Sequence, residues 1–501
     1  MPPAEHPADP PSALPLPGGR NYVADFVERR PADLIALVTE SATGARRELT
    51  FGTLVQRAGT FAGALAERGV RRGDTVLLLL GSSAEFVVAV LACLRIGAAA
   101  LPCSEQLRPK DLALRLRAAR PTLAVCHQRN AEALAQAAPD CPVLHVEDGR
   151  ELPAGPVPPS ADLGPTDPAF VLFTSGTSGP PKLVTHGQRY VWGQQLQAAH
   201  WLGARRGELI WSTAAPGWSK SARNSFIAPW FGGARALLQD RRFDPDERLA
   251  TIRREGVGVL CMAPTEYRLI AAQSRVGELP SLRRLVTAGE PLGVGAVRAW
   301  RERTGLEIAD GYGQTETGHI AGARPGESAP PGSMGRPLPG IDVRIVDGEL
   351  TVDPMTVPTF FLGYDGRDVE TAASDRGWWR TGDQVRQDED GWLYFEARTD
   401  DVILSAGYRI GPAEVESALS SHPAVREVAV VGEPDEARGQ IVCARVVLRE
   451  GYQAGDDLVA QLQAHARAET APYKYPRRIT FVDALPKTST GKTDRAALRS
   501  G

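Results

Sequence analysis

Short apolar runs alternate with helix-like segments along most of the chain. Residues 51–70 carry apolar side chains at helical spacing, and the apolar run 75–80 follows after a turn. Buried strands separated by helices are typical of parallel sheets that are covered on both faces. We therefore predict an α/β fold with a large N-terminal domain of mixed, mostly parallel sheets with helices. Further apolar runs occur at 121–127, 169–176, 208–214, 257–264, 282–290 and 307–313.

The pattern changes near residue 400. Residues 391–397 form a candidate strand, and the rest of the chain follows the order helix, strand, strand, helix, strand. This order predicts a small, mobile C-terminal α+β domain over 400–501, joined at Asp400 to the large domain over 21–399. Residues 1–20 are proline-rich and lack a basic start and an apolar core, so we expect a disordered lead-in and not a signal peptide.

The most apolar segment, residues 76–102, does not predict a membrane span. Gly81, Ser82, Glu85 and Arg95 interrupt it, which favours a strand, a capped turn and a buried helix. The formal charge of −3, without a basic cluster, argues against a nucleic-acid partner. The six cysteines are scattered without a C-x-x-C pair, which is typical of reduced thiols in a cytoplasmic protein, and the histidines show no metal-binding spacing.

Lysine is rare in this chain, since only six of the 57 basic residues are lysine. Where arginine is so strongly preferred, a retained lysine suggests a need for a compact ammonium group instead of a planar guanidinium. Lys182 and Lys492 lie in motifs that have a chemical interpretation, and both therefore become candidate functional residues.

The stretch FTSGTSGPPK, residues 173–182, has the composition of a phosphate-binding loop. It is not a Walker loop, which requires the lysine to follow a glycine and open a helix, whereas Lys182 follows Pro181. We expect instead a hydroxyl-rich loop that wraps a polyphosphate, with a polar surface turn as the alternative. The residues concerned are Thr174, Ser175, Gly176, Thr177 and Ser178.

A second glycine-rich motif, DGYGQTETG, covers residues 310–318. Its glycines allow the backbone to approach a ligand, Thr315 offers a hydroxyl, and Glu316 offers a carboxylate suited to a hard metal ion such as Mg²⁺. In WWRTGD, Asp383 can accept hydrogen bonds from both hydroxyls of a ribose. The remaining motifs are RTDD, SAGYRIGPAEVE and PKTSTGK, at residues 398–401, 405–416 and 486–492.

In this order the motifs resemble those of the acyl-adenylate-forming superfamily, which includes acyl-CoA synthetases, luciferases and nonribosomal adenylation domains. The similarity runs from about residue 45 to the C-terminus, and it looks closest to the medium-chain acyl-CoA synthetase branch. The resemblance implies that a carboxylic acid attacks the α-phosphate of ATP to give acyl-AMP, which the thiol of CoA then attacks. It thus implies ATP, Mg²⁺ and CoA as cofactors. The stretches that carry the finer likeness are 215–234, 261–270, 286–292 and 405–419.

The resemblance also implies roles for individual residues. Lys182 and the loop 174–178 would hold the β- and γ-phosphates, Thr315 the α-phosphate and Glu316 the Mg²⁺ ion. Lys492, on the small domain, would bridge the carboxylate and the α-phosphate. The other candidates for ATP and AMP binding are Gly289, Glu290, Pro291, Asp310, Gly311, Tyr312 and Gln314, with Asp383 and Arg398 at the ribose.

For the second half-reaction, the small domain would rotate about Asp400, withdraw Lys492 and present the CoA-binding residues. Gly313 lies where acetate-specific relatives carry a tryptophan, so we expect a deep pocket and a substrate larger than acetate. The candidate CoA-binding residues are Ser405, Ala406, Gly407, Tyr408 and Arg409, and the candidate acyl-pocket residues are Trp218, Phe226, Trp230 and Gly313. Ordinary core packing is the alternative for the three aromatic side chains.

The leading hypothesis is an AMP-forming acid–CoA ligase for a medium-sized or bulky carboxylic acid. The alternatives are an enzyme that loads an acyl carrier protein, a ligase that only thioesterifies an adenylate made by a partner ligase, and a non-catalytic binding protein. Retention of Lys182, Glu316, Asp383 and Lys492 argues against the last of these. The chain differs from the family pattern at Ala397, where a methyl group is expected to crowd the nucleotide.

Overall fold

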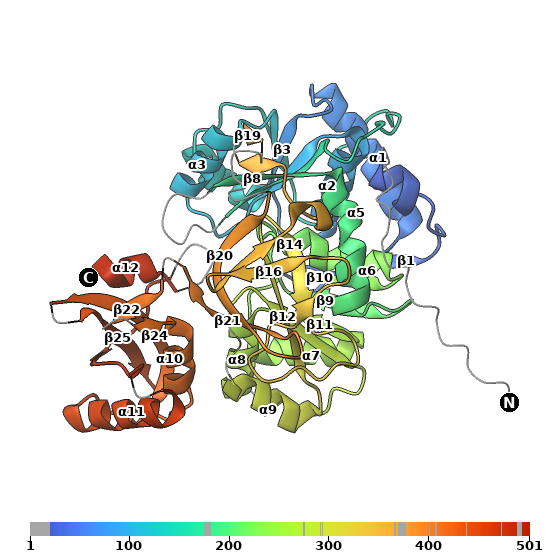
Figure 1. Ribbon diagram of the computed structural model, residues 1–501. Coiled ribbons are helices and arrows are strands. Elements are labelled where there is room, and N and C mark those ends of the chain that lie inside the picture. The colour runs from blue at the N-terminus through green and yellow to red at the C-terminus, as the bar shows by residue number, and fades with distance from the viewer. Residues whose placement is uncertain are drawn as a thin grey trace.

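The chain folds into a large mixed α/β domain and a small α+β domain beside it, as the computed structural model in Figure 1 shows. The predicted lead-in and the predicted joint at Asp400 lie outside the residues that the structure describes. Those residues are 21–174, 182–273, 276–290, 292, 294–364, 367–368, 377–399, 401–405, 408–436, 438–471, 473–487 and 493–500.

One sheet of the large domain has parallel strands at its centre and antiparallel strands at one edge. The pairs β3–β4, β3–β5 and β5–β6 are parallel, whereas β7–β8 is antiparallel and brackets the loop that begins at Thr174. Its strands, in spatial order, are β19 (Arg367–Asp368), β18 (Gly363–Tyr364), β8 (Leu183–Gly187), β7 (Pro168–Phe173), β4 (Ala99–Pro102), β3 (Thr75–Leu79), β5 (Leu123–His127) and β6 (Val143–Val146).

A nine-stranded sheet forms the other half of the large domain. It is parallel from β1 through β10, β9, β11 and β12 to β13, with antiparallel strands at both edges. This arrangement confirms the predicted fold class. Its strands, in spatial order, are β15 (Arg336–Pro337), β14 (Gly318–Gly322), β13 (Ile308–Gln314), β12 (Arg284–Ala288), β11 (Val259–Cys261), β9 (Leu209–Ser212), β10 (Arg235–Gln239), β1 (Ile35–Glu40) and β2 (Arg46–Thr50).

The most apolar segment of the sequence folds as a strand, a capped turn and a buried helix. After β3, the Ser83 hydroxyl accepts a hydrogen bond from the Phe86 N–H at 3.3 Å and caps α2 (Ala84–Ile96). Gly97 ends the helix with a φ of 75°, a conformation that favours glycine. Every residue of α2 except Arg95 is buried. None of the described helices is both long and apolar enough to cross a membrane.

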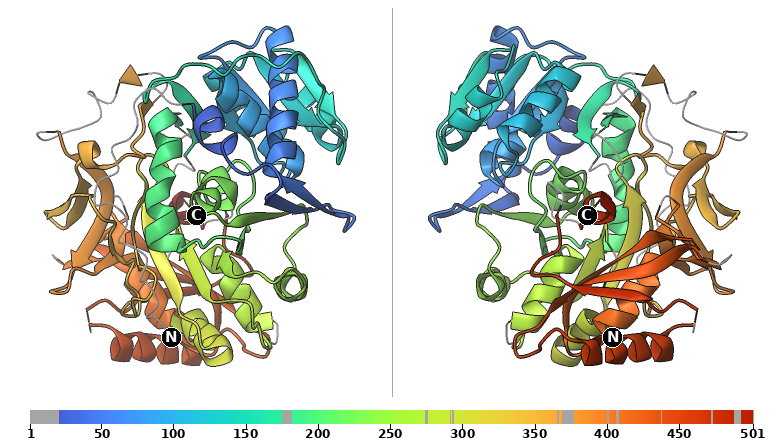
Figure 2. Two further views of the ribbon diagram at one scale, coloured as in Figure 1. Left: turned by 90° about the vertical axis from the view of Figure 1, so that its right-hand side faces the viewer. Right: turned by 90° about the vertical axis from the view of Figure 1, so that its left-hand side faces the viewer.

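A shared hydrophobic core joins the two sheets through α1, α2 and α5. Figure 2 shows further helices on the outside of the large domain. The helices of this domain are α1 (Phe51–Glu67), α2, α3 (Pro109–Ala119), α4 (Ala131–Gln136), α5 (Gln188–Gln197), α6 (Ala228–Phe231), α7 (Pro245–Glu255), α8 (Pro264–Gln273) and α9 (Val294–Thr304). Short helical turns are η1 (Val23–Val27), η2 (Gln128–Asn130), η3 (Ala198–Leu202), η4 (Arg223–Ile227) and η5 (Pro354–Thr356).

A four-stranded sheet leads to the small domain, whose core lies between its own sheet and α10 and α11. The four strands are β16 (Val343–Val346), β17 (Glu349–Val352), β20 (Trp379–Gln387) and β21 (Leu393–Arg398). The small domain contains β22 (Ile403–Ser405), β23 (Tyr408–Ile410), β24 (Val425–Asp435), β25 (Gly439–Leu448), β26 (Arg478–Phe481), α10 (Pro412–Ser420), α11 (Asp456–Glu469) and α12 (Arg495–Ser500).

The C-terminal helix α12 is tied to the start of the small domain by ion pairs. The buried Asp401 accepts from Arg499 at 2.8 Å and lies 3.8 Å from a guanidinium nitrogen of Arg495. Arg495 also donates to both carboxylate oxygens of Glu416 on α10, at 2.6 and 2.7 Å. Asp401, which directly follows the predicted joint, is therefore held to the C-terminal helix by ion pairs.

Candidate active site

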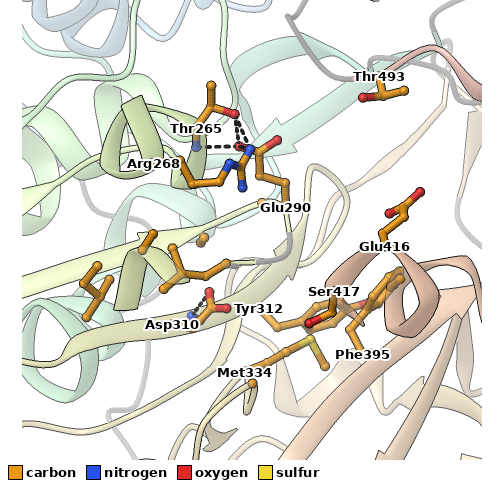
Figure 3. A pocket seen from close by; sticks show the side chains of 18 of the residues that line it. Thr265, Arg268, Glu290, Asp310, Tyr312, Met334, Phe395, Glu416, Ser417 and Thr493 are labelled. Atoms are coloured by element: carbon orange, nitrogen blue, oxygen red, sulfur yellow. Dashed lines mark hydrogen bonds and ion pairs between the residues drawn. The ribbon is translucent and has the colours of Figure 1, made fainter. Parts of the chain in front are cut away.

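All candidate residues that the structure describes in the large domain, except Phe226 and Trp230, line one cavity, which also has walls from the small domain. The cavity follows the C-terminal ends of β12 and β13, where open α/β sheets usually bind ligands. Figure 3 shows Glu290, Asp310 and Tyr312 in this wall, with Glu416 and Ser417 of α10 on another side. The candidates that line it are Thr174, Lys182, Trp218, Gly289, Glu290, Asp310, Gly311, Tyr312, Gly313, Gln314, Thr315, Glu316, Asp383 and Arg398.

Other candidates lie elsewhere or cannot be placed. The CoA candidates Ser405 and Tyr408 face each other on the β22–β23 hairpin and do not line the cavity. Tyr408 instead stacks on Tyr473, with 4.2 Å between ring centroids. The roles of the following residues stay predictions, because they lie outside the described part of the chain: Ser175, Gly176, Thr177, Ser178, Pro291, Asp400, Ala406, Gly407 and Lys492, together with the side chain of Arg409.

Backbone hydrogen bonds hold the two ends of the phosphate-binding candidate loop side by side. The Thr174 N–H donates to the Lys182 carbonyl at 3.0 Å, and the Lys182 N–H donates to the Thr174 hydroxyl at 3.1 Å. The exposed Lys182 ammonium lies 5.0 Å from the centroid of the Tyr364 ring. The Tyr364 hydroxyl donates to Glu316 Oε1 at 2.7 Å. Tyr364 thus connects the candidate phosphate-binding lysine to the candidate metal ligand.

Tyr364→Phe is expected to lower adenylation about three- to tenfold, because one hydrogen bond to a carboxylate is lost while the ring beside Lys182 remains. Tyr364→Ala removes both contacts and should cause a larger loss. Steady-state pyrophosphate release at varied ATP and Mg²⁺ concentrations measures both variants. Equal losses in the two variants would show that the ring beside Lys182 contributes nothing beyond the hydroxyl.

His186 fixes the peptide group that links the candidate residues Thr315 and Glu316. Its Nε2 donates to the Thr315 carbonyl at 2.7 Å, and its ring lies 4.0 Å from that of Tyr190. Burial lowers the pKa of His186 to about 3, so the ring is neutral and acts as a structural donor. The sequence analysis missed this residue, since an isolated histidine in a strand gives no local signal.

Asp383 lies at the centre of a buried hydrogen-bond network. Its Oδ2 accepts from the Tyr312 hydroxyl at 2.5 Å and from Gln314 Nε2 at 2.9 Å, and its Oδ1 accepts from Arg398 at 3.0 Å. Burial raises the pKa of Asp383, although Arg398 opposes this effect. A carboxylate has about four acceptor sites. Asp383 can therefore accept from both ribose hydroxyls only if one of the three donors moves.

Lys220 brings positive charge to the acidic wall of the cavity. Its ammonium donates to the Ala288 carbonyl at 2.8 Å. Burial raises the pKa of Asp310 to about 8, with Glu290 adding to the rise and Lys220 opposing it. For Glu290, burial is outweighed by Arg268 and by hydrogen bonds from Thr265, so its pKa is lowered. The rarity of lysine, which singled out Lys182 and Lys492, could have singled out Lys220 as well.

Asp310→Asn is expected to weaken the pH dependence of stability. Because the pKa of Asp310 is raised from 3.8 to about 8, the folded protein holds a proton that the unfolded chain releases in this interval. The wild type therefore loses stability as the pH rises from about 4 to about 8. The Tm of the variant minus the Tm of the wild type, both measured without ligand, should increase as the pH rises. Parallel curves of Tm against pH would contradict this expectation.

Two of the predicted acyl-pocket residues lie in the hydrophobic core and not in the cavity wall. Phe226 packs against Phe86 and Trp230, and the Trp230 indole N–H donates to the Ala36 carbonyl at 2.9 Å. Both side chains are fully buried. Trp218 does line the cavity. The alternative of core packing thus describes Phe226 and Trp230.

Glycine is needed at position 313 for a reason other than the one expected. A Cβ on Gly313 would lie 1.8 Å from the Gly318 carbonyl oxygen, because the β13–β14 pair is irregular there. Any side chain at position 313 would therefore clash with the backbone at the start of β14. The expected crowding by Ala397 is also absent, since this residue is buried and does not line the cavity. Its methyl group faces Gly411.

The chain matches known proteins over nearly its full length. The profile described as AMP-binding enzyme matches residues 23–358, and the profile described as AMP-binding enzyme C-terminal domain matches residues 414–492. The acyl-coenzyme A synthetase ACSM3 of Pongo abelii is 38% identical over 473 residues, or 88% of this chain and 81% of that protein. The uncharacterized acyl–CoA ligase YtcI of Bacillus subtilis is 36% identical over 488 residues, or 93% of this chain and 92% of that protein.

Solved structures agree with the sequence relatives. The anthranilate CoA ligase AuaEII, in complex with anthranoyl-AMP, has a TM-score of 0.87 at 31% identity, covering 97% of this chain and 98% of that one. A benzoate CoA ligase from Burkholderia xenovorans has a TM-score of 0.86 at 28% identity, covering 96% and 100%. The resemblance seen in the sequence is confirmed, and the chain belongs to the AMP-binding enzyme family, among its acyl-CoA synthetases.

Proposed function

We propose that the protein is an AMP-forming acid–CoA ligase that activates a medium-sized or bulky carboxylic acid. The observation that carries the proposal is the joint placement of Lys182, Glu316 and the Asp383–Arg398 pair around one cavity between two domains. Such a cavity offers cations for phosphates and a carboxylate for a ribose. Two similar solved structures are named for anthranilate and benzoate, which supports a bulky acid.

In the first half-reaction two anions must meet, so their charges have to be neutralised. Lys182 would bind the terminal phosphates of ATP, and Asp383 with Arg398 would hold the ribose. His186 would keep the Thr315 hydroxyl in place at the α-phosphate by fixing its backbone. Lys492 would neutralise the developing charge between the carboxylate and the α-phosphate.

Glu316 fits a role in Mg²⁺ binding. Mg²⁺ usually takes one or two carboxylates together with substrate phosphates. Glu316 uses Oε1 for the Tyr364 hydroxyl, and its carboxylate retains acceptor sites for an ion. When bound, Mg²⁺ would neutralise phosphate charge.

In the second half-reaction, the small domain would rotate about Asp400 and bring the β22–β23 hairpin to the cavity. That hairpin carries Ser405 and Tyr408 and does not line the cavity in the present arrangement, which agrees with a need for rotation. We propose a cytoplasmic location, which the six free cysteines support because free thiols are expected in a reducing compartment.

Pyrophosphate release and CoA-ester formation from ATP and a panel of acids test the proposal. Acid-dependent pyrophosphate release with CoA-ester formation supports it. CoA-ester formation only from presynthesised acyl-AMP would replace it with a thioesterification-only ligase. Adenylation without transfer to free CoA, but with transfer to a phosphopantetheine carrier protein, would favour a carrier-loading enzyme.

A further inference from the structure

Arg223 is a buried arginine without a counter-ion in the described part of the chain. Its exposed fraction is 5%, and its Nε and Nη1 atoms are buried without a hydrogen-bond partner. None of the ion pairs among the described residues includes it. Moving a charged group out of water without a partner costs several kcal/mol. A group that binds in the cavity can supply the missing partner, because Arg223 lines the cavity.

A local distortion of the helix places Arg223 at the cavity. Arg223 begins η4, a π-helical turn in which the Ala228 N–H donates to the Arg223 carbonyl five residues earlier. Trp218 and Lys220 just before it also line the cavity, whereas Phe226 within the turn packs in the core. Turns of this kind occur frequently at functional sites.

The groups that surround Arg223 do not neutralise it. Burial is the main cause that lowers the pKa values of His186 and His319, and the positive charge of Arg223 lowers both further, so both rings are neutral. Lys220 lies one turn earlier and is itself a cation. Burial raises the pKa of Asp310 to about 8, so this carboxyl is mostly protonated at neutral pH, and the negative charge of Glu290 is associated with Arg268 and, to a lesser extent, with Lys220. Arg223 therefore leaves this part of the cavity positively charged.

We propose that Arg223 binds a second carboxylate of the acid substrate, at the end of the acyl group away from the reacting carboxyl. The proposal rests on the proposed ligase function and specifies its substrate class as a dicarboxylic acid. A guanidinium presents parallel N–H donors that match both oxygens of a carboxylate. One carboxylate becomes the thioester, and the other stays ionised at Arg223.

Matched pairs of acids test this assignment in the wild type. Terephthalate is compared with p-toluate, and adipate with hexanoate, by kcat/KM for CoA-ester formation and by calorimetric binding without ATP. A site built around a polar partner rejects an analogue that lacks it, so we expect the diacid of at least one pair to be preferred about 10²–10³-fold. Preference for the monoacid in every pair would overturn the proposal.

The variants Arg223→Met and Arg223→Lys locate the preference. Arg223→Met should abolish the diacid preference and leave monoacid turnover within a few-fold or improve it. Arg223→Lys keeps the charge without the paired donors and should retain part of the preference. Arg205→Met, at an exposed arginine outside the cavity, is the control and should match the wild type. Equal losses for both acids of a pair in Arg223→Met would overturn the assignment.

Failure of the proposed function gives a different result. If no acid yields a CoA ester, the binding measurement still decides the role of Arg223: tighter diacid binding by the wild type than by Arg223→Met supports it, and equal or absent binding overturns it. If Arg223→Met does not fold, as judged by circular dichroism, the wild-type comparison of matched acids decides alone.

Discussion

Lys492→Ala is expected to abolish adenylation and to leave CoA-ester formation from presynthesised acyl-AMP within a few-fold of the wild type. The reason is electrostatic: the carboxylate and the α-phosphate both carry negative charge, and Lys492 would be the group that bridges them. Losing a preorganised donor of this kind costs about 10²–10³ in rate. The second half-reaction starts from acyl-AMP, where that charge has already been relieved. Pyrophosphate release and thioester formation, measured separately, check the expectation.

Lys110→Ala is the control, because Lys110 is an exposed lysine on α3 that does not line the cavity. It should retain both half-reactions. If Lys492→Ala slowed both half-reactions equally, the bridging role would be excluded and a role in folding or domain closure would replace it. Comparison of Tm values for the two variants separates these two explanations.

Asp383→Ala is expected to lower kcat/KM for ATP about 10²–10³-fold, because hydrogen bonds to a charged group contribute about 1.5–3 kcal/mol each. It should also reduce the free energy of unfolding by about 1–3 kcal/mol, since the buried Tyr312 hydroxyl and the Gln314 amide lose their acceptor. Nucleotide titration and chemical denaturation measure the two effects.

Asp383→Asn separates the structural and the binding contribution. Its amide oxygen can still accept from Tyr312, so most of the stability should return, whereas the weaker acceptor should leave ATP use impaired. Glu389→Ala, at an exposed position in the turn between β20 and β21, is the control for this hairpin. Full recovery of ATP use in Asp383→Asn would refute the need for a charged group at the ribose.

The parts of the fold and site that the sequence predicted are those encoded locally. The strand, the cap and the buried helix from Thr75 to Ile96 are determined by residues close together in the sequence. The same holds for the glycine-rich motif at residues 310–318. The resemblance also grouped Asp383 with Arg398, and the structure places them 3.0 Å apart. For these features, the short-range sequence pattern and the order of the motifs were enough to predict what the structure shows.

The contacts that the sequence did not predict are long-range or depend on an irregular helix. His186 is bonded to Thr315, which is 129 residues away, and no local pattern announces such a pair. The π-turn at Arg223 changes the helical spacing, so a regular helical periodicity assigns the wrong faces to the residues that follow. Phe226 was expected in the acyl pocket because it is an aromatic residue in a stretch that resembles the family, and the π-turn places Phe226 in the core and Arg223 at the cavity.

The ion pairs of α12 limit how the C-terminal segment, which carries the proposed catalytic Lys492, could move independently of the rest of the small domain. For the C-terminal segment to detach alone, Asp401 would have to release Arg499 and Glu416 would have to release Arg495. Charge-assisted hydrogen bonds contribute about 1.5–3 kcal/mol each, so the two together amount to about 3 kcal/mol even at the low end. At equilibrium fewer than about one molecule in a hundred would then have a detached C-terminal segment. In the proposed mechanism, withdrawal of Lys492 and rotation of the small domain would thus be one thermodynamic event, and a ligand that favours either one would favour both.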